Sequence, residues 1–175
     1  KAIEEQIARY PDDARYRVFA GGFYNSYSQS EEALKHLEKA VELSPRKQTI
    51  LFQLGSLYVI TKQYDKALEV FKKTYDLEPS FAEAKRFYGG ALIYVGREEE
   101  AKELLGEGHE DAFLSAYADL GRWDKVIPIL KTRIAQDPGN FQTRMNLVAA
   151  YFQSGDKNSA VATLREMITL NPSFK

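Results

Sequence analysis

The chain of 175 residues contains no cysteine. This absence excludes disulfide bridges, thiolate metal ligands and cysteine nucleophiles, and it leaves the cellular compartment undetermined. Histidine is scarce, because the sequence holds only His36 and His109. The acidic residues beside His109 follow it directly, so on a helix they point in different directions and converge poorly on one ion. We interpret His36 as an exposed polar residue, and we expect no metal site, no cofactor and no enzymatic activity in this chain.

Net charge is also almost absent, since 24 lysines and arginines face 25 aspartates and glutamates. Without a basic excess, the chain lacks the electrostatic footprint of a protein that binds nucleic acid or an anionic membrane. No apolar run approaches the roughly 18 residues of a membrane-spanning helix, so we expect no direct insertion of this segment into a membrane.

The chain starts at Lys1, in the middle of a helical pattern, and we interpret it as a piece of a longer protein. We expect a soluble domain whose localisation stays unknown. It could lie in the cytoplasm or be tethered to a membrane through the parent chain.

Two amphipathic helices are predicted within residues 48–81, joined by a short polar turn. Apolar residues recur at helical spacing in both halves, and glycine and alanine stand where two backbones must approach closely. Proline closes the segment because it cannot continue a helix. The residues that carry this pattern are Leu51, Leu54, Gly55, Tyr58, Ala67, Phe71 and Pro79.

This spacing resembles the tetratricopeptide repeat, with Leu51 where that pattern often has tryptophan. The same pattern recurs in phase along nearly the whole chain. The expected segments are a second-helix remnant at 1–13, complete repeats at 14–47 and 48–81, a truncated repeat-like segment at 82–106, a repeat-like segment at 107–140 and a last repeat at 141–175. The resemblance implies an all-α fold, a right-handed α-solenoid of stacked helix-turn-helix pairs whose third repeat is truncated at residues 106–108.

The resemblance also implies that the first helix of each pair lines a concave surface. We expect that surface to be apolar and partly aromatic, as in grooves that bind a peptide or a helix of another protein. The side chains expected to line it are Val18, Phe19, Phe52, Ser56, Arg86, Phe87, Tyr94, Met145, Asn146 and Phe152. Some tetratricopeptide modules bind the terminal carboxylate of a chaperone tail with paired charges and amides, but the matching places here hold residues such as Gly22 and Phe87. We therefore do not expect a chaperone tail as the ligand.

Two further interpretations stay open. Val161, Ile168 and Leu170 form an apolar stripe on the last helix that no later repeat in this sequence covers, so two copies could pair as a homodimer through their terminal repeats. Alternatively, the sequence around YPDDAR and ELSPRKQTILFQLGSLY is similar to the repeat tails of bacterial O-antigen-ligase-like membrane proteins. That resemblance would make the chain an accessory tail of a larger enzyme, with the catalytic residues elsewhere.

Overall fold

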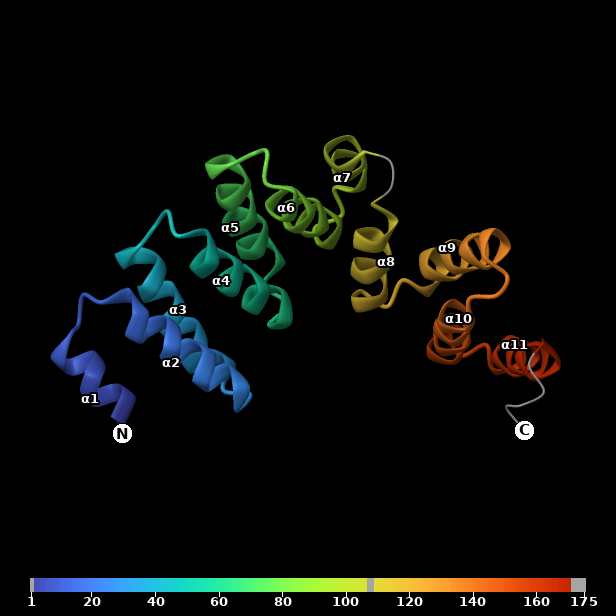
Figure 1. Cartoon of the computed structure of the whole chain (residues 1–175), viewed down its shortest axis with the longest axis horizontal. Helices are drawn as coiled ribbons and strands as arrows, with labels where there is room; N and C mark the ends of the chain where they lie inside the picture. The colour runs from blue at the N-terminus through green and yellow to red at the C-terminus, as the bar shows by residue number, and fades with distance from the viewer. Residues whose placement is uncertain (1, 107–108, 171–175) are drawn as a thin grey trace. The chain divides into compact units, whose positions relative to one another are not determined.

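The computed structural model describes residues 2–106 and 109–170, and every regular element in these ranges is an α-helix. The chain divides into two compact units, residues 1–105 and residues 106–175. The all-α prediction is confirmed. Each unit is described by itself below, with the helix labels of Figure 1.

Unit 1 contains a single short helix followed by three helix pairs. The helices are α1 (Ala2–Arg9), α2 (Ala14–Ser26) with α3 (Ser30–Leu43), α4 (Gln48–Ile60) with α5 (Tyr64–Leu77), and α6 (Ala82–Tyr94) with α7 (Glu98–Leu105). Each helix packs against the next one along the chain, and in Figure 1 α5 and α7 lie above α4 and α6.

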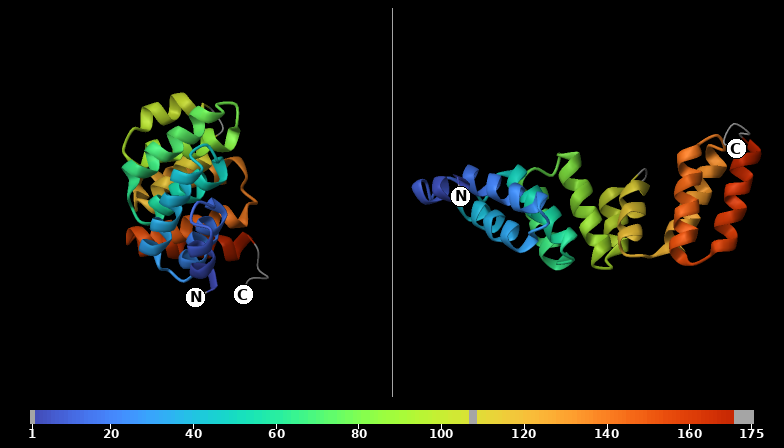
Figure 2. Two further views of the ribbon diagram at one scale, coloured as in Figure 1. Left: turned by 90° about the vertical axis from the view of Figure 1, so that its left-hand side faces the viewer. Right: turned by 90° about the horizontal axis from the view of Figure 1, so that it is seen from below.

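Unit 2 contains two helix pairs. They are α8 (Glu110–Asp119) with α9 (Trp123–Gln136), and α10 (Phe141–Ser154) with α11 (Lys157–Leu170). The last three helices lie side by side in the right-hand view of Figure 2. Pro172, which the sequence places at the end of the last repeat, lies outside the described residues.

Close packing within the pairs of unit 1 depends on one glycine in each first helix. Gly55 lies against the ring of Phe71 so tightly that a Cβ atom at Gly55 would come within 2.6 Å of it. The same relation joins Gly21 to Leu37 and Gly89 to Leu105, where the Cβ atom would come within 2.7 Å and 2.5 Å. Since non-bonded carbon atoms rest at about 3.5–4.0 Å, a Cβ atom at any of these positions would force the buried side chain opposite to shift.

The third pair of unit 1 is cut short, as the sequence predicts. Helix α7 has 8 residues, whereas α3 and α5 have 14 residues each. Gly106 follows α7 with a φ of +73°, a conformation that glycine adopts without steric cost. The predicted break at 106–108 falls at the boundary between the two units, although residues 107 and 108 lie outside the described residues.

The turn inside each helix pair contains a residue with a positive φ at the same place. Three of these residues are glycines (Gly96, Gly121 and Gly155), but Ser28 and Lys62 each adopt a φ of 58°. The left-handed conformation costs a residue with a Cβ atom roughly 1–2 kcal/mol. The glycines could be recognised as turn residues from the sequence, whereas the strain at Ser28 and Lys62 could not.

We expect Lys62→Gly to raise the free energy of unfolding by about 0.5–1 kcal/mol, because relief of the left-handed strain exceeds the extra entropy that glycine gives the unfolded chain. Lys73→Gly is the matched control, since Lys73 is exposed in the middle of α5. That control should lower the free energy of unfolding by about 1 kcal/mol. Urea denaturation followed by circular dichroism measures both changes, and a destabilised Lys62→Gly variant would contradict the prediction.

Candidate functional site

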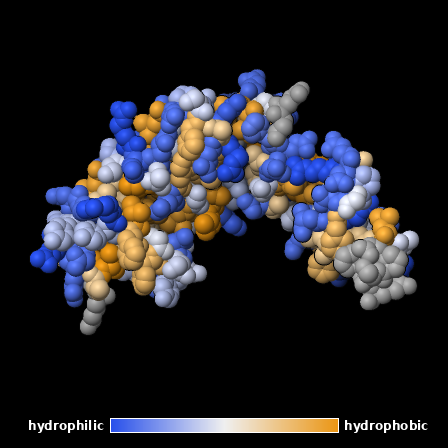
Figure 3. Space-filling model, in the orientation of Figure 1, coloured by the Kyte–Doolittle hydropathy of each residue, from blue (hydrophilic) through white to orange (hydrophobic). Residues whose placement is uncertain are grey.

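The residues predicted to line a groove fall in both units. Those from Val18 to Tyr94 belong to unit 1, on α2, α4 and α6. Met145, Asn146 and Phe152 belong to unit 2, on α10. Hydrophobic residues reach the surface of unit 1 between charged ones in Figure 3.

An aromatic cluster joins α4, α5 and α6. The ring of Phe52 lies 5.1 Å from that of Phe87 and 6.0 Å from that of Phe81, measured between centroids. Phe71 of α5 is buried at the centre of the cluster and stacks on Phe87 at 5.0 Å. Phe52 and Phe87 are therefore half-buried. One part of each ring holds consecutive repeats together, and the remaining part is accessible.

The other predicted residues on α6 are Arg86 and Tyr94. The Arg86 guanidinium lies 4.7 Å from the centroid of the Phe87 ring, and its Nη2 atom lies 3.7 Å from a Glu83 carboxylate oxygen. Tyr94 is half-buried and stacks on Tyr64 at 4.9 Å. Arg86 is exposed, so it can contact a ligand that lies on α6.

Three small residues occupy the same place on the first helices of unit 1. These are Gly22 on α2, Ser56 on α4 and Gly90 on α6. A Cβ atom at Gly22 or Gly90 would have no neighbour within 4 Å. Unlike Gly55, these two glycines are not required by the packing of the protein itself, although a helix-interior glycine costs about 1 kcal/mol relative to alanine.

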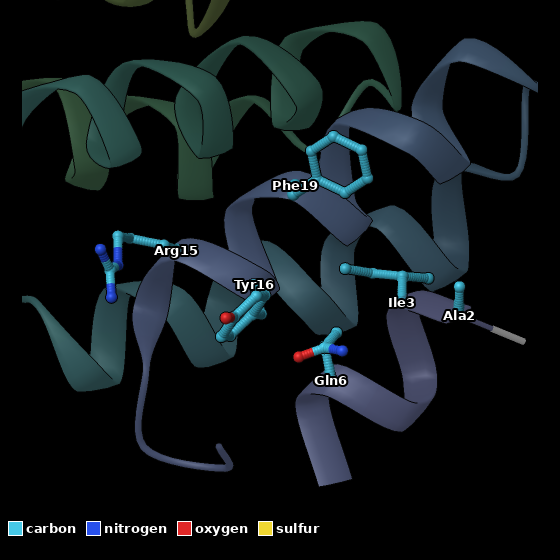
Figure 4. Close-up of a pocket in the computed structure, with 6 residues that line it drawn as sticks. All are labelled: Ala2, Ile3, Gln6, Arg15, Tyr16 and Phe19. Carbon is cyan, nitrogen blue, oxygen red and sulfur yellow. The ribbon is translucent and has the colours of Figure 1, made fainter. Parts of the chain in front are cut away.

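Phe19 lies apart from the aromatic cluster and is 65% exposed, while Val18 beside it is half-buried. Phe19 lines a hollow of ≈ 510 Å³ between α1 and α2, together with Ile3 and Tyr16 (Figure 4). Of the residues that line this hollow, only Phe19 is among those predicted from the sequence to contact a ligand. The repeat phase was the signal that could have revealed Ile3, because Ile3 lies 34 residues before Leu37.

A polar cluster attaches α1 to the first helix pair. The Tyr24 hydroxyl donates a hydrogen bond to Glu4 Oε1 at 3.0 Å, which raises the pKa of Tyr24. The His36 ring stacks on the Tyr24 ring at 5.3 Å between centroids, and its Nε2 atom lies 3.6 Å from Glu4 Oε1. An Nη1 atom of Arg17 lies 3.5 Å from His36 Nδ1.

The expectation that His36 is an exposed polar residue is wrong. His36 is only 7% exposed, because α1 and Tyr24 cover the face of α3 on which it lies. Burial lowers the pKa of the imidazole, and this effect outweighs the nearby Glu4 carboxylate, which favours the protonated form. His36 is therefore a structural residue at the junction of α1, α2 and α3.

In unit 2 the predicted residues lie at the surface of α10. Phe152 is 63% exposed, Met145 is also exposed, and Asn146 accepts a hydrogen bond from the Gln142 side chain at 2.9 Å. On α11, the predicted end face is exposed at Val161, Ile168 and Leu170. The assignment of these residues, and of those in unit 1, to ligand contact stays a prediction.

The described residues contain neither a membrane-spanning helix nor a cluster of metal-binding side chains. No helix in the described ranges combines the length and the apolar character that crossing a membrane requires. Within the same ranges, no three histidine, aspartate or glutamate side chains gather in a way that could hold a metal ion.

Family models of the tetratricopeptide repeat match most of the chain. One matches residues 58–120 and 117–173, and another matches residues 27–80. The chain therefore belongs to the tetratricopeptide repeat family, and its helix pairs are those of an α-solenoid. Members of this family bind protein partners and are generally non-catalytic, so the fold supports a role as a protein–protein interaction scaffold.

The curated relatives are much longer than this chain. The BBSome complex member BBS4 homolog of Drosophila melanogaster is 22% identical over 97% of this chain and 39% of the relative. Protein O-mannosyl-transferase TMTC1 of Homo sapiens is 29% identical over 50% of this chain and 10% of the relative. The chain thus spans well under half of either relative. These matches do not show the resemblance to O-antigen-ligase-like proteins.

Solved structures with 18–22% sequence identity to this chain support its fold and nothing about its function. A tetratricopeptide repeat protein from Parabacteroides merdae has a TM-score of 0.70 and 18% identity, covering 95% of this chain and 70% of that chain. YrrB, described as a TPR protein with an unusual peptide-binding site, has a TM-score of 0.55 and 22% identity, covering 98% of this chain and 93% of that one.

The buried His36 predicts a pH dependence of stability. Because its pKa is lower in the folded state than the ordinary value of 6.5, the unfolded chain binds the proton more tightly. The contribution of neutral His36 to the free energy of unfolding is fully present above pH 6.5. It is lost as the pH falls through 6.5 towards the lowered pKa of His36 in the folded state. Glu4, Arg17, Glu32 and Lys35 are the charged groups that act on the ring.

His36→Phe should remove this part of the pH dependence, because phenylalanine can keep the stacking on Tyr24 but cannot be protonated. The measurement is the free energy of unfolding in urea at pH 7.5 and pH 5.5, by circular dichroism. His109→Gln, which alters the other histidine, should retain the loss on acidification. An equal loss in wild type and His36→Phe would contradict the assignment.

Proposed function

We propose that the first helices of unit 1 bind an extended peptide segment of another protein. The observation that carries the proposal is the open space beside Gly22 and Gly90, in line with Ser56 on the helix between them. Glycine on a helix surface lets another backbone approach closely. Packing within the protein does not require these glycines, and each of them destabilises its helix relative to alanine. Close approach of a ligand backbone would explain why glycine stands there.

The side chains next to this line suit a peptide ligand. The accessible parts of Phe52 and Phe87 offer apolar surface for a ligand side chain, and Arg86 offers hydrogen-bond donors for a ligand carbonyl or carboxylate. Aromatic surface with a few polar groups is typical of peptide-recognition grooves. The division into repeats at 14–47, 48–81 and 82–106 is part of the same proposal. It places Gly22, Ser56 and Gly90 at equivalent positions of their repeats.

Gly90→Ala should separate binding from stability. The substitution should raise the free energy of unfolding by up to about 1 kcal/mol, because alanine is the better helix former and the space is open. It should nevertheless weaken binding of peptides selected from a random 12-residue display library on the immobilised wild-type chain. Gly90→Leu, which fills the same space further, should weaken binding at least 10-fold. Fluorescence anisotropy with labelled peptides measures the affinities.

Gly139→Ala is the matched control, since it adds the same methyl group in unit 2 with only an ordinary contact at 3.6 Å. Its affinity for the selected peptides should equal that of wild type. Phe52→Ala and Phe87→Ala are less suitable, because loss of a partly buried ring from the cluster should itself cost about 2–4 kcal/mol of stability. Equal peptide affinities for wild type and Gly90→Leu would overturn the proposal.

A second candidate function is self-association through α11. The equivalent stripe on the earlier second helices, such as Leu34 and Val41 on α3, is half-buried and packs against the core. On α11 the corresponding Val161 and Ile168 are exposed, and Leu164 between them is also exposed. We propose that this end face pairs with the same face of a second copy, which would remove its apolar surface from water.

Val161→Asp should therefore yield a monomer at protein concentrations where the wild type forms a dimer, since a charge in an apolar interface is costly. Sedimentation velocity over a range of protein concentrations measures the association. Ala135→Asp adds the same charge at an exposed position of α9 and should leave the dimer intact. A wild-type chain that stays monomeric at several hundred micromolar would refute this second function.

A further inference from the structure

A polar hollow of ≈ 310 Å³ in unit 2 is lined by residues of three consecutive helices, α9, α10 and α11. These helices lie side by side in the right-hand view of Figure 2. The polar side chains that line the hollow carry either a charge or a hydroxyl group, and they are Lys131, Arg144, Tyr151, Ser159, Thr163 and Glu166.

The hollow lies on the opposite side of α11 from the exposed end face. Ser159 and Glu166 are seven residues apart, which is about two helical turns, so they share one side of α11. Val161 and Ile168 are each two residues further along the chain, which corresponds to a rotation of about 200° around the helix. The hollow is thus bounded by the second helices of two consecutive pairs and by the first helix between them.

One tyrosine position on the first helices is paired with a carboxylate in unit 1. Tyr24, Tyr58 and Tyr151 are each the eleventh residue of their helix, on α2, α4 and α10. The Tyr24 hydroxyl donates a hydrogen bond to Glu4 Oε1 at 3.0 Å, and the Tyr58 hydroxyl donates one to Glu38 Oε1 at 2.6 Å. Both glutamates lie on the preceding helix, 20 residues before the tyrosine.

In unit 2 a lysine stands at the place of that glutamate. Lys131 lies on α9, 20 residues before Tyr151. Its Nζ atom is 5.7 Å from the centroid of the Tyr151 ring, and an ammonium group cannot accept a hydrogen bond. Tyr151 is only 8% exposed, and its hydroxyl has no hydrogen-bond partner among the described residues. The Tyr151 hydroxyl is therefore a nearly buried donor that a ligand in the hollow can satisfy.

The charges around the hollow leave one positive charge uncompensated. The Arg144 side chain is 13% exposed, and its Nη1 atom faces Glu166 Oε2 at 3.9 Å, so these two charges offset each other. Lys131 forms no ion pair within the described ranges. The Asp156 carboxylate senses its charge but already accepts a hydrogen bond from a backbone N–H at the start of α11, at 3.0 Å. Two cations and one anion line the hollow, so their net charge is +1.

We propose that this hollow binds a single carboxylate group, which accepts hydrogen bonds from the Tyr151 hydroxyl and the Lys131 ammonium. The ligand thereby supplies the acceptor that Glu38 supplies to Tyr58 in unit 1. One negative charge matches the net charge of the lining residues, whereas a phosphate dianion would exceed it and lie close to Glu166. An acidic side chain of a partner protein and a small organic acid both carry the required group.

The test compares two short peptides that differ only in one charge. The blocked tripeptides acetyl-Ala-Glu-Ala-amide and acetyl-Ala-Gln-Ala-amide are titrated into the full chain labelled with ¹⁵N, at constant ionic strength, and backbone amide shifts are followed by NMR. We expect the glutamate peptide to shift amides of α9, α10 and α11 with a dissociation constant on the order of 1 mM, as for contact through one small group. The glutamine peptide should bind about 10-fold more weakly.

Lys131→Glu should abolish the site while stabilising unit 2. The new carboxylate stands where unit 1 has its glutamate, so it should accept the Tyr151 hydroxyl and exclude the ligand, weakening binding of the glutamate peptide about 10-fold. The midpoint of thermal unfolding, followed by the fluorescence of Trp123 in α9, should rise by about 2–4 °C.

Two tyrosine variants separate the ligand's hydrogen bond from packing. Tyr151→Phe should weaken binding of the glutamate peptide without lowering the unfolding midpoint, because no hydrogen bond within the protein is lost. Tyr58→Phe is the matched variant in unit 1. It loses the bond to Glu38 and should lower the midpoint measured by circular dichroism, while the affinity for the glutamate peptide stays that of wild type.

Two further controls locate the binding. Lys125→Glu reverses an exposed charge of α9 that does not line the hollow, so it should leave the affinity unchanged. Gly90→Leu should also have no effect, so this inference and the proposed peptide surface of unit 1 can fail separately. A parallel titration with propionate identifies the source of the carboxylate: tighter binding of the tripeptide indicates a protein side chain, and tighter binding of propionate indicates a small organic acid.

The inference is overturned if the glutamate and glutamine peptides bind wild type equally, or if wild type and Lys131→Glu bind the glutamate peptide equally. It is likewise overturned if Lys125→Glu weakens binding as much as Lys131→Glu does, since the attraction would then be general rather than local.

Discussion

A side chain of the second helix rests directly on a glycine of the first helix in each pair of unit 1. Gly21, Gly55 and Gly89 are the three contact points, and each would place a Cβ atom within 2.7 Å of its neighbour. This contact sets how closely the two helices of a pair approach. Within unit 1 the position of the next pair depends on it, because each pair packs its side surface against the next pair along the chain.

Helix α11 shows the surface that the stacking covers on an earlier second helix. Val161 and Ile168 on α11 are exposed, whereas their equivalents on α3, Leu34 and Val41, are half-buried because the next helix pair covers them.

Phe52 and Phe87 show why the candidate site could be predicted only in part. Their spacing places them on the first helices, but the sequence does not say how much of each ring the neighbouring repeat covers. That depends on Phe71 and Phe81, which approach from two other segments. His36 is the clearer case, because the sequence predicts an exposed polar residue, whereas α1 and Tyr24 cover it in the folded chain.

The sequence by itself determined the all-α class, the helix pairs and the truncation of the third pair, because these follow from local periodicity and from glycine and proline at fixed spacing. Only the tertiary structure decided which small residues serve packing. Gly89 and Gly90 are adjacent and alike in sequence, yet one lies on Leu105 and the other faces open space. The physical reason is that a turn of about 100° between successive residues points one at the paired helix and the next away from it.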